Sequence, residues 1–267
     1  MIAAAVQMTC TSDAAANFAQ AERQIRKAAA RGAQLVVTPE NTNYLGPHAE
    51  KVRLAEPVDG PTISRFADLA RELGLHLVIG SFAERSEHPG RTYNTTVVIG
   101  PDGAILATYR KIHLFDVDVS DEVRFRESDT VAPGDRAVVV DTALGKIGLS
   151  ICYDLRFGEL YRALVERGAE IILIPAAFTL MTGKDHWDVL IRARAIETQA
   201  WVIAPGQVGR HDDGGLRASF GHSMIVDPWG AVVAMASDGP GVAVAEIDLA
   251  RVGEVRRAIP VCDHRRL

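Results

Sequence analysis

The chain of 267 residues has few cysteines, no long apolar run and no excess of positive charge. Its three cysteines are an odd number and lie far apart in the sequence, which argues against a disulfide framework and fits a reducing cytoplasm. The densest apolar run, 171–181, is too short to span a bilayer and is interrupted by Pro175. Because the net charge is −5, we expect neither nucleic acid nor a membrane surface as the main partner.

The sequence also lacks a signal-peptide pattern, a metal-binding motif and a phosphate-binding loop. The start, MIAAAVQMTC, lacks the basic and long apolar regions of a signal peptide. No cysteine and histidine pairs have the spacing of a metal site, and no glycine-rich phosphate-binding loop occurs, so we expect no metal and no other cofactor. The chain does have 48% hydrophobic and 24% charged residues, which is enough for a large core in one compact domain over 1–267.

The chain contains an internal duplication. The segment RGAQLVVTPE (31–40) is repeated as RGAEIILIPA (167–176), and 97–109 is repeated as 224–236 in the same order. The distance in sequence between each segment and its repeat indicates a repeated unit of roughly 130 residues rather than a short-period solenoid.

Each unit has the pattern strand, helix, strand, helix, strand and then a hairpin. Helical spacing of apolar residues predicts helices at 13–31 and 61–73 in the first unit, and at 157–167 and 184–199 in the second. The strand segments LVVT and IILI are continuously apolar, so we expect both faces of these strands to be buried.

The expected fold is of the α/β class. If helices cover one face of each sheet, the two remaining faces must pack against each other, which gives a four-layer α-β-β-α sandwich with internal pseudo-twofold duplication. No linker rich in proline, glycine or serine separates the halves, and we expect 116–135 to be a loop rather than a domain boundary.

Three predicted strand ends carry an acid, a cation and a thiol. Glu40 follows LVVTP, Lys111 lies in ILATYRKIHLFD, and Cys152 ends KIGLSIC. Taken singly, a solvated glutamate, a surface lysine or a small buried cysteine would be unremarkable at these positions. Together they are the parts of a nucleophilic acyl-transfer site.

Each of these groups has a predicted role. A thiol with a pKa near ~8.5 is mostly protonated at neutral pH, so Cys152 needs a base. Glu40 can accept the proton and later pass it to a leaving amine, while Lys111 and the backbone N–H of Tyr153 can stabilise an oxyanion. Glu127, in FRESDT, is a weaker candidate that can orient the lysine or a water molecule.

Other interpretations remain open at this point. A cysteine–histidine pair is the rival arrangement, with His113, His186 at the start of a predicted helix, or His222 at the start of a predicted strand. A redox-active thiol would lack a resolving cysteine near Cys152 in the sequence. A binding or scaffold protein without catalysis is a third alternative, which the intact acid, lysine and cysteine segments disfavour.

The chain resembles a known superfamily in all three segments. TPEN around Glu40, YRKIHLFD around Lys111 and ICYDLRF around Cys152 resemble, in order, the catalytic blocks of the nitrilase, or carbon–nitrogen hydrolase, superfamily. The resemblance covers nearly the whole chain, and HWDVLIRARAIETQ and GHSMIVDPWG are similar to the Nit-type amidases. It implies the α-β-β-α sandwich, a homodimer or higher homo-oligomer, a Glu-Lys-Cys triad of these three residues, and a second glutamate at Glu127.

The resemblance also implies an activity. A cysteine-dependent amidase would hydrolyse a terminal carboxamide to acid and ammonia through a thioester intermediate. The segment 206–230 is similar to deaminated-glutathione amidases, and 176–187 is similar to these and to omega-amidases. Deaminated glutathione is therefore the first expected substrate, with α-ketoglutaramate or α-ketosuccinamate as the alternative, and with carbamoylase or nitrilase activity less favoured.

These substrates carry carboxylates, so the pocket needs a cation. Arg156 is the first choice for this role, and Lys184 and Arg210 are the alternatives. Phe178 and Thr179, just beyond the IILIPAA segment, are expected to line the pocket.

Overall fold

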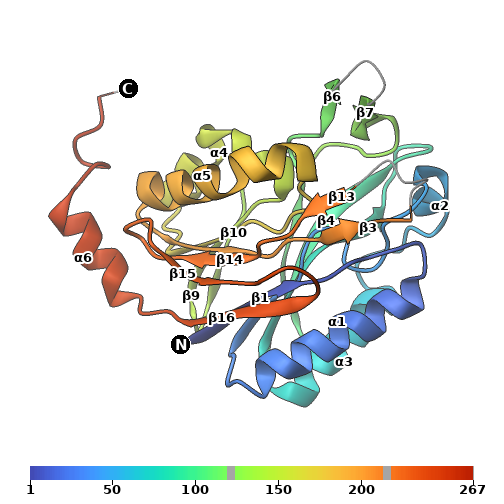
Figure 1. Ribbon diagram of the computed structural model, residues 1–267, viewed down its shortest axis with the longest axis horizontal. Helices are drawn as coiled ribbons and strands as arrows, with labels where there is room; N and C mark the ends of the chain where they lie inside the picture. Colours follow the sequence, from blue (N-terminus) through green and yellow to red (C-terminus); the bar gives the residue numbers. More distant parts are fainter. Residues whose placement is uncertain (119–123, 213–217, 267) are drawn as a thin grey trace.

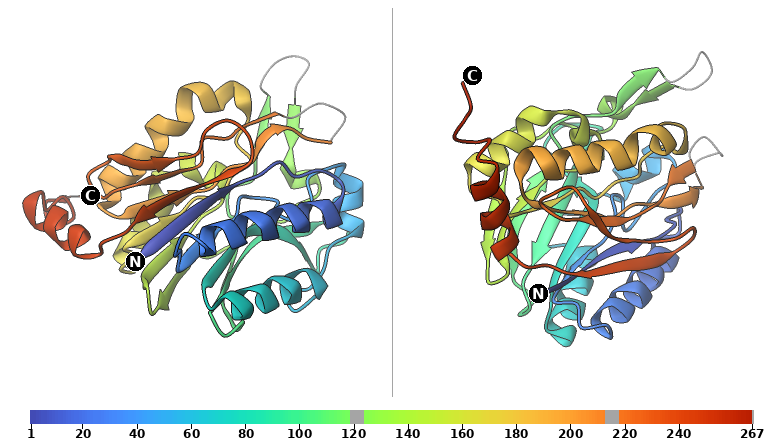
Figure 2. Two further views of the ribbon diagram at one scale, coloured as in Figure 1. Left: turned by 60° about the horizontal axis from the view of Figure 1, so that its bottom comes forward. Right: turned by 60° about the vertical axis from the view of Figure 1, so that its left-hand side comes forward.

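The computed structural model describes residues 1–118, 124–212 and 218–266. Two six-stranded sheets pack against each other, and helices lie on their outer sides (Figures 1 and 2). The expected four-layer α-β-β-α arrangement is confirmed. None of the helices in these ranges combines the length and the apolar character needed to cross a membrane.

The first sheet has the strand order β16-β1-β2-β3-β4-β5. Helices α1 and α3 cover its outer face, and the short helix α2 lies beside the end of β3. Asp13 caps α1, because its side chain accepts a hydrogen bond of 2.9 Å from the N–H of Ala16. The bounds are β1 Ile2–Gln7, α1 Ala14–Ala29, β2 Leu35–Val37, α2 His48–Arg53, α3 Pro61–Leu73, β3 His76–Arg85, β4 Thr92–Ile99, β5 Ile105–Arg110 and β16 Gly241–Glu246.

The second sheet has the order β15-β14-β11-β10-β9-β8, and α4 and α5 cover its outer face (Figure 1). Two small hairpins, β6–β7 and β12–β13, pair separately from the two six-stranded sheets. The bounds are β6 Asp116–Asp118, β7 Arg124–Arg126, β8 Val139–Thr142, β9 Gly145–Leu149, α4 Gly158–Glu166, β10 Ile171–Leu173, α5 Leu180–Thr198, β11 Trp201–Ala204, β12 Val208–Arg210, β13 Ala218–Phe220, β14 Met224–Val226, β15 Val232–Met235 and α6 Ala250–Ala258.

The two sheets repeat one topology. Strands β1, β2 and β3 are parallel neighbours, as are β9, β10 and β11. An antiparallel strand flanks the first of each set, β16 on β1 and β8 on β9. Two antiparallel steps follow each set, so β5 again runs in the direction of β2. The carboxyl ends of β2 and β5 therefore meet at the same edge of their sheet.

Alternate residues of the inner strands enter different cores. Ala3 and Ala5 of β1 belong to the core between the sheets, whereas Ala4 and Val6 pack with the helices of the outer layer. Because side chains of a strand alternate between its two faces, a strand between two cores must be apolar on both. This confirms the expectation for LVVT and IILI, whose strands β2 and β10 are buried throughout.

Two expected elements differ in the structure. Helix α5 begins at Leu180, before the predicted start at 184, so His186 lies inside it. Gly183 within this helix packs so closely on Phe220 that an added Cβ would lie 2.4 Å from the Cβ of Phe220. The segment 116–135 is not entirely a loop, because β6 and β7 pair within it and ion pairs such as Arg126–Asp118, at 2.8 Å, link them.

Candidate active site

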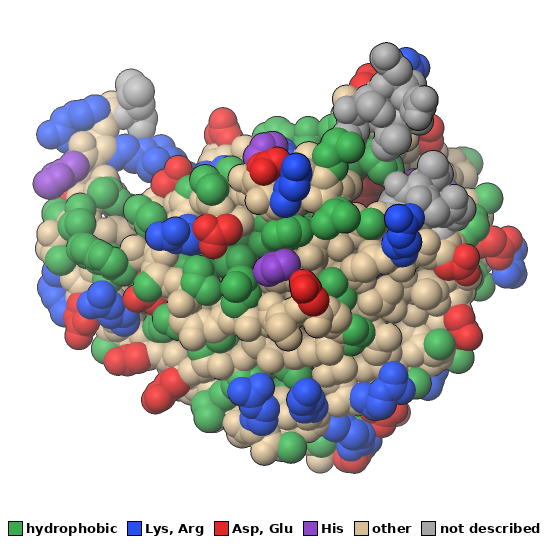
Figure 3. Space-filling model, viewed as in Figure 1, with side chains coloured by type: hydrophobic (Ala, Val, Ile, Leu, Met, Phe, Trp, Pro, Cys, Tyr) green, Lys and Arg blue, Asp and Glu red, His purple; other side chains and the backbone are tan. Residues whose placement is uncertain are grey.

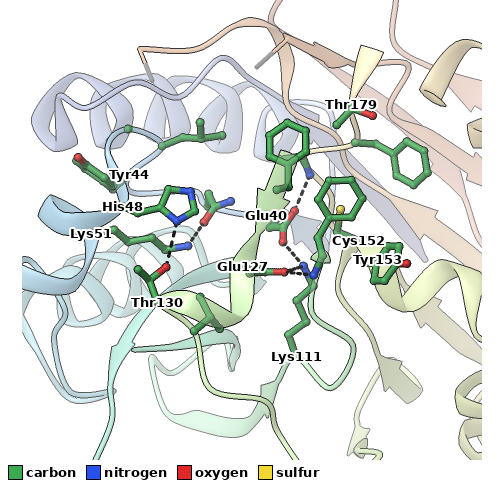
Figure 4. A pocket seen from close by; sticks show the side chains of 18 of the residues that line it. Glu40, Tyr44, His48, Lys51, Lys111, Glu127, Thr130, Cys152, Tyr153 and Thr179 are labelled. Carbon is green, nitrogen blue, oxygen red and sulfur yellow. Dashed lines mark hydrogen bonds and ion pairs between the residues drawn. The ribbon is translucent and has the colours of Figure 1, made fainter. Parts of the chain in front are cut away.

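The carboxyl ends of strands from both sheets meet at one pocket (Figure 4). Glu40 lies just beyond β2, Lys111 directly follows β5, and Cys152 begins η2 (Cys152–Arg156) after β9. Glu40 is 3%, Lys111 1% and Cys152 8% exposed. Glu127 and Tyr153 line the same pocket. The structure thus brings together the five residues that the sequence singled out for chemistry.

Lys111 bridges two carboxylates. Its Nζ lies 3.1 Å from Oε1 of Glu40 and 2.8 Å from Oε2 of Glu127. The amide of Asn94, on β4, donates to the same two carboxylates at 2.9 and 3.2 Å. Asn94 was not singled out from the sequence, because one polar residue inside a strand carries no pattern of its own.

Backbone groups fix the orientation of both carboxylates. Oε2 of Glu40 accepts the N–H of Ala177 at 2.8 Å, and Oε2 of Glu127 accepts the N–H of Phe115 at 2.7 Å. Ala177 follows β10, so the second repeat orients an acid carried by the first. Gly80 makes this approach possible, since an added Cβ there would lie 2.6 Å from Cβ of Pro175.

Cys152 occupies a strained turn. Its φ of +47° lies in the left-handed region, which costs a non-glycine residue on the order of 1–3 kcal/mol. Hydrogen bonds hold the turn: the N–H of Cys152 donates to Pro175 O at 2.9 Å, and Asp154 accepts the N–H of Ile151 at 2.8 Å. Because the Cys152 N–H is occupied in this way, the N–H of Tyr153 is the backbone donor that follows the sulfur.

The surroundings set the charge states of the site. Burial raises the pKa of Cys152 well above its ordinary value, Glu40 raises it further, and the opposing effect of Lys111 is smaller. Burial lowers the pKa of Lys111, but Glu127 and Glu40 outweigh it and hold that pKa well above its ordinary value. The resting site therefore has a protonated thiol beside a charged lysine.

Glu127 is ionised in this arrangement. Burial raises its pKa, but Lys111 outweighs the burial and lowers the pKa to about 2. A carboxyl group with a lowered pKa stabilises the fold above its unfolded-state pKa of about 4.3. This stabilisation is lost as the pH falls toward 2.

The residues predicted to bind substrate divide into two groups. Arg156, Phe178 and Thr179 line the pocket, and the guanidinium of Arg156 lies 5.2 Å from the ring centre of Phe178. Lys184 is outside the pocket lining, 3.8 Å from Asp185, and Arg210 is exposed on β12. Arg156 is thus the one of the three predicted cations that faces the pocket.

The three candidate histidines have other partners. His113 Nδ1 lies 2.7 Å from Oδ1 of Asp154, His186 Nδ1 lies 3.3 Å from Arg156, and His222 stacks on Phe220 at 4.3 Å. None of these histidines lines the pocket in the described part of the chain, so the rival cysteine–histidine pair is wrong. Within the same ranges, no cluster of three histidine, cysteine or acidic side chains is arranged to hold a metal ion.

A second group of polar residues in the pocket was missed. Tyr44, His48, Lys51 and Thr130 line the side of the pocket beyond Glu40 and Glu127 (Figure 4). Asn41, which accepts a hydrogen bond from Lys51, also lines the pocket. They come from the segment around α2 and from the loop after η1 (Glu127–Asp129), neither of which has a repeated or periodic pattern.

The chain matches the family described as Carbon-nitrogen hydrolase over residues 2–257 and belongs to this family. The resemblance to the nitrilase superfamily is thereby confirmed. Membership of this family, together with relatives that are named as amidases and are described next, identifies the protein as a hydrolase that acts on carbon–nitrogen bonds of amides.

Three relatives illustrate the similarity. Deaminated glutathione amidase of Bos taurus is 46% identical over 270 residues, covering 99% of this chain and 82% of the bovine protein. Omega-amidase NIT2 of Homo sapiens is 39% identical, covering 98% of this chain and 94% of its own length. The crystal structure of the C. elegans NitFhit protein superposes with a TM-score of 0.92 at 40% identity, and this chain spans 65% of its length.

Proposed function

We propose that Cys152 is the nucleophile of this amidase and that Glu40 is its general base. The thiol of Cys152 gives its proton to Glu40 while the sulfur bonds to the carbonyl carbon of the substrate. Glu40 then donates this proton to the leaving nitrogen, the carbon–nitrogen bond breaks, and a thioester remains. In the second half Glu40 takes a proton from water, the hydroxide attacks the thioester, and the departing sulfur recovers the proton.

The oxyanion formed in both halves needs positive partners. The ammonium of Lys111 and the N–H of Tyr153 are proposed to hold it, and Glu127 is proposed to keep the ammonium in place from 2.8 Å. The observation that carries the proposal is that one buried ammonium contacts two carboxylates in the pocket that the thiol of Cys152 also lines. A thiol that is neutral at rest requires a base within reach, and Glu40 lines the same pocket and raises the pKa of Cys152.

The proposed substrate is a keto-acid amide that carries a carboxylate, with deaminated glutathione as first choice. The amidase of Bos taurus at 46% identity supports it, and Arg156 supplies a cation. The human omega-amidase at 39% identity supports α-ketoglutaramate or α-ketosuccinamate as the second candidate. Deaminated glutathione links its keto acid to cysteinylglycine, so its hydrolysis releases a dipeptide amine, whereas a terminal carboxamide releases ammonia.

A substrate panel tests this proposal. The purified enzyme is expected to hydrolyse deaminated glutathione with a higher kcat/KM than α-ketoglutaramate, and to leave glutamine, a carbamoyl amino acid and a simple nitrile nearly untouched. The released dipeptide amine and ammonia are measured separately, so the two kinds of leaving group are distinguished. Faster hydrolysis of α-ketoglutaramate would favour the omega-amidase assignment, and no hydrolysis of any keto-acid amide would contradict the proposal.

The remaining expectations concern assembly and location. We propose that residues 1–267 form one domain, which acts in a reducing compartment such as the cytoplasm, and that two copies pair.

Figure 3 shows hydrophobic side chains on the face formed by α5 and β15. A mass of two chains in sedimentation equilibrium is the expected result, and a single-chain mass would contradict the dimer. Five apolar residues in this region are more than half exposed: Met181, Val189, Ile196, Trp229 and Met235.

A further inference from the structure

The side of the pocket beyond Glu40 is built around a second cation, Lys51 of α2. Its Nζ donates to Oδ1 of Asn41 at 2.7 Å. Asn41 is buried and has a φ of +58°, and its N–H donates to Oγ of Ser81 at 2.8 Å. Asparagine tolerates this left-handed backbone, and its side-chain oxygen accepts the hydrogen bond that positions the ammonium of Lys51.

The charges of Glu40, Glu127 and Lys111, the central cluster of the pocket, explain why the positive charge of Lys51 matters. Glu40 and Glu127 carry two negative charges and Lys111 carries one positive charge, so the cluster has a net charge of −1. An anionic group of the substrate that passed this cluster would be repelled. Lys51 supplies a positive charge on the far side of Glu40 and Glu127 from Cys152 (Figure 4). Lys51 also lowers the pKa of Glu127, so the two lysines together balance the two carboxylates. The ammonium of Lys51 is then a cation that an anionic group of the substrate meets on that side of the pocket.

The proposed chemistry determines which part of the substrate reaches Lys51. Glu40 protonates the leaving nitrogen, so this nitrogen must face Glu40 while the carbonyl carbon faces Cys152. The acyl chain then lies on the side of Arg156 and Phe178, which contact each other near Cys152. The substituent on the nitrogen extends past Glu40, toward Asn41 and Lys51.

We infer that Lys51, held by Asn41, binds a carboxylate on the leaving amine of the substrate. This inference rests on the proposed function and sharpens it. The enzyme would be suited to N-substituted amides whose amine portion ends in a carboxylate, as in a peptide, rather than to unsubstituted carboxamides. His48, whose Nδ1 lies 3.0 Å from Oγ1 of Thr130, completes the polar wall around this position.

The test compares substrates that differ only in that carboxylate. Deaminated glutathione and its glycinamide analogue share the acyl group and the scissile amide, but the analogue lacks the terminal charge. Because a hydrogen bond to a charged group is a strong one, the wild-type enzyme is expected to prefer the acid by about tenfold or more in kcat/KM. In Lys51→Met this preference is expected to fall to about one, and in Lys51→Arg it should persist.

Controls separate a local effect from general damage. Lys184→Met removes an exposed lysine outside the pocket and should keep the wild-type preference. Hydrolysis of α-ketoglutaramate, which has no leaving-group carboxylate, reports folding and the chemical steps in every variant. A preference that survives in Lys51→Met, or that is absent from the wild type, would overturn the inference. If the wild type hydrolysed none of the three amides, the proposed function itself would fail instead.

Discussion

Replacing Cys152 by alanine is expected to lower kcat for amide hydrolysis by about 10⁴-fold or more, because no other group in the pocket can form the thioester. The fold should persist, since the change removes one small side chain at the end of a strand. The measurement is product release at saturating substrate, together with a thermal unfolding curve. The matched control is Cys262→Ala, which changes an exposed cysteine outside the pocket and should retain full activity.

The pH dependence of alkylation of Cys152 tests the environment of its thiol independently of turnover. Because burial and Glu40 raise the pKa of Cys152, its alkylation by iodoacetamide should keep accelerating beyond pH 9. A free thiol levels off near its pKa of ~8.5. Site-resolved mass spectrometry separates Cys152 from the other cysteines. Wild-type turnover in Cys152→Ala would contradict the proposed mechanism, whatever the alkylation profile shows.

Replacing Lys111 by methionine is expected to damage both rate and stability. Loss of one oxyanion donor commonly lowers kcat by about 10²–10³-fold. The substitution also leaves Glu40 and Glu127 buried with no cation between them, and breaking a buried pair in this way destabilises a protein by about 3–5 kcal/mol. The measurements are kcat and the free energy of unfolding at pH 7, with Lys184→Met as the control on an exposed lysine.

A double variant separates these two effects. In Lys111→Met combined with Glu127→Gln, one of the two uncompensated carboxylates becomes neutral, so part of the lost stability should return while kcat stays low. Independent, additive losses of stability would indicate that Lys111 and Glu127 are not coupled. A double variant with restored turnover would show that the charge of Lys111 is not needed for the oxyanion.

The buried strands and the three reactive side chains at their ends are predicted from the sequence because each depends on a short local segment. The continuously apolar segments of β2 and β10 favour strands buried on both faces, and residues that follow both strands line one pocket. The acid, cation and thiol segments therefore identify the pocket before any coordinates. Their convergence is an observation of the structure, whereas the roles of Glu40, Lys111 and Cys152 in catalysis stay predictions.

The features that the sequence does not predict depend on contacts between segments that are remote in the sequence. Asn94 becomes significant only when β4 lies beside two carboxylates that are remote in the sequence. Gly183 has a low helix propensity, yet it lies inside α5, where Phe220 packs closely against it. Lys51 lies in a short helix without periodicity, and its place in the pocket depends on the left-handed backbone of Asn41.

The pairing of β1 with β16 has a consequence for the newly made chain. Ile2 pairs with Glu246 and Gln7 with Gly241, so β1 leaves the ribosome well before its partner strand β16 has been made. At about 5–20 residues per second, this delay is roughly ten to fifty seconds. During that interval an apolar strand has an open edge, which favours mispairing between nascent polypeptides. Loss of β16 would therefore leave this edge open permanently and favour aggregation of the product.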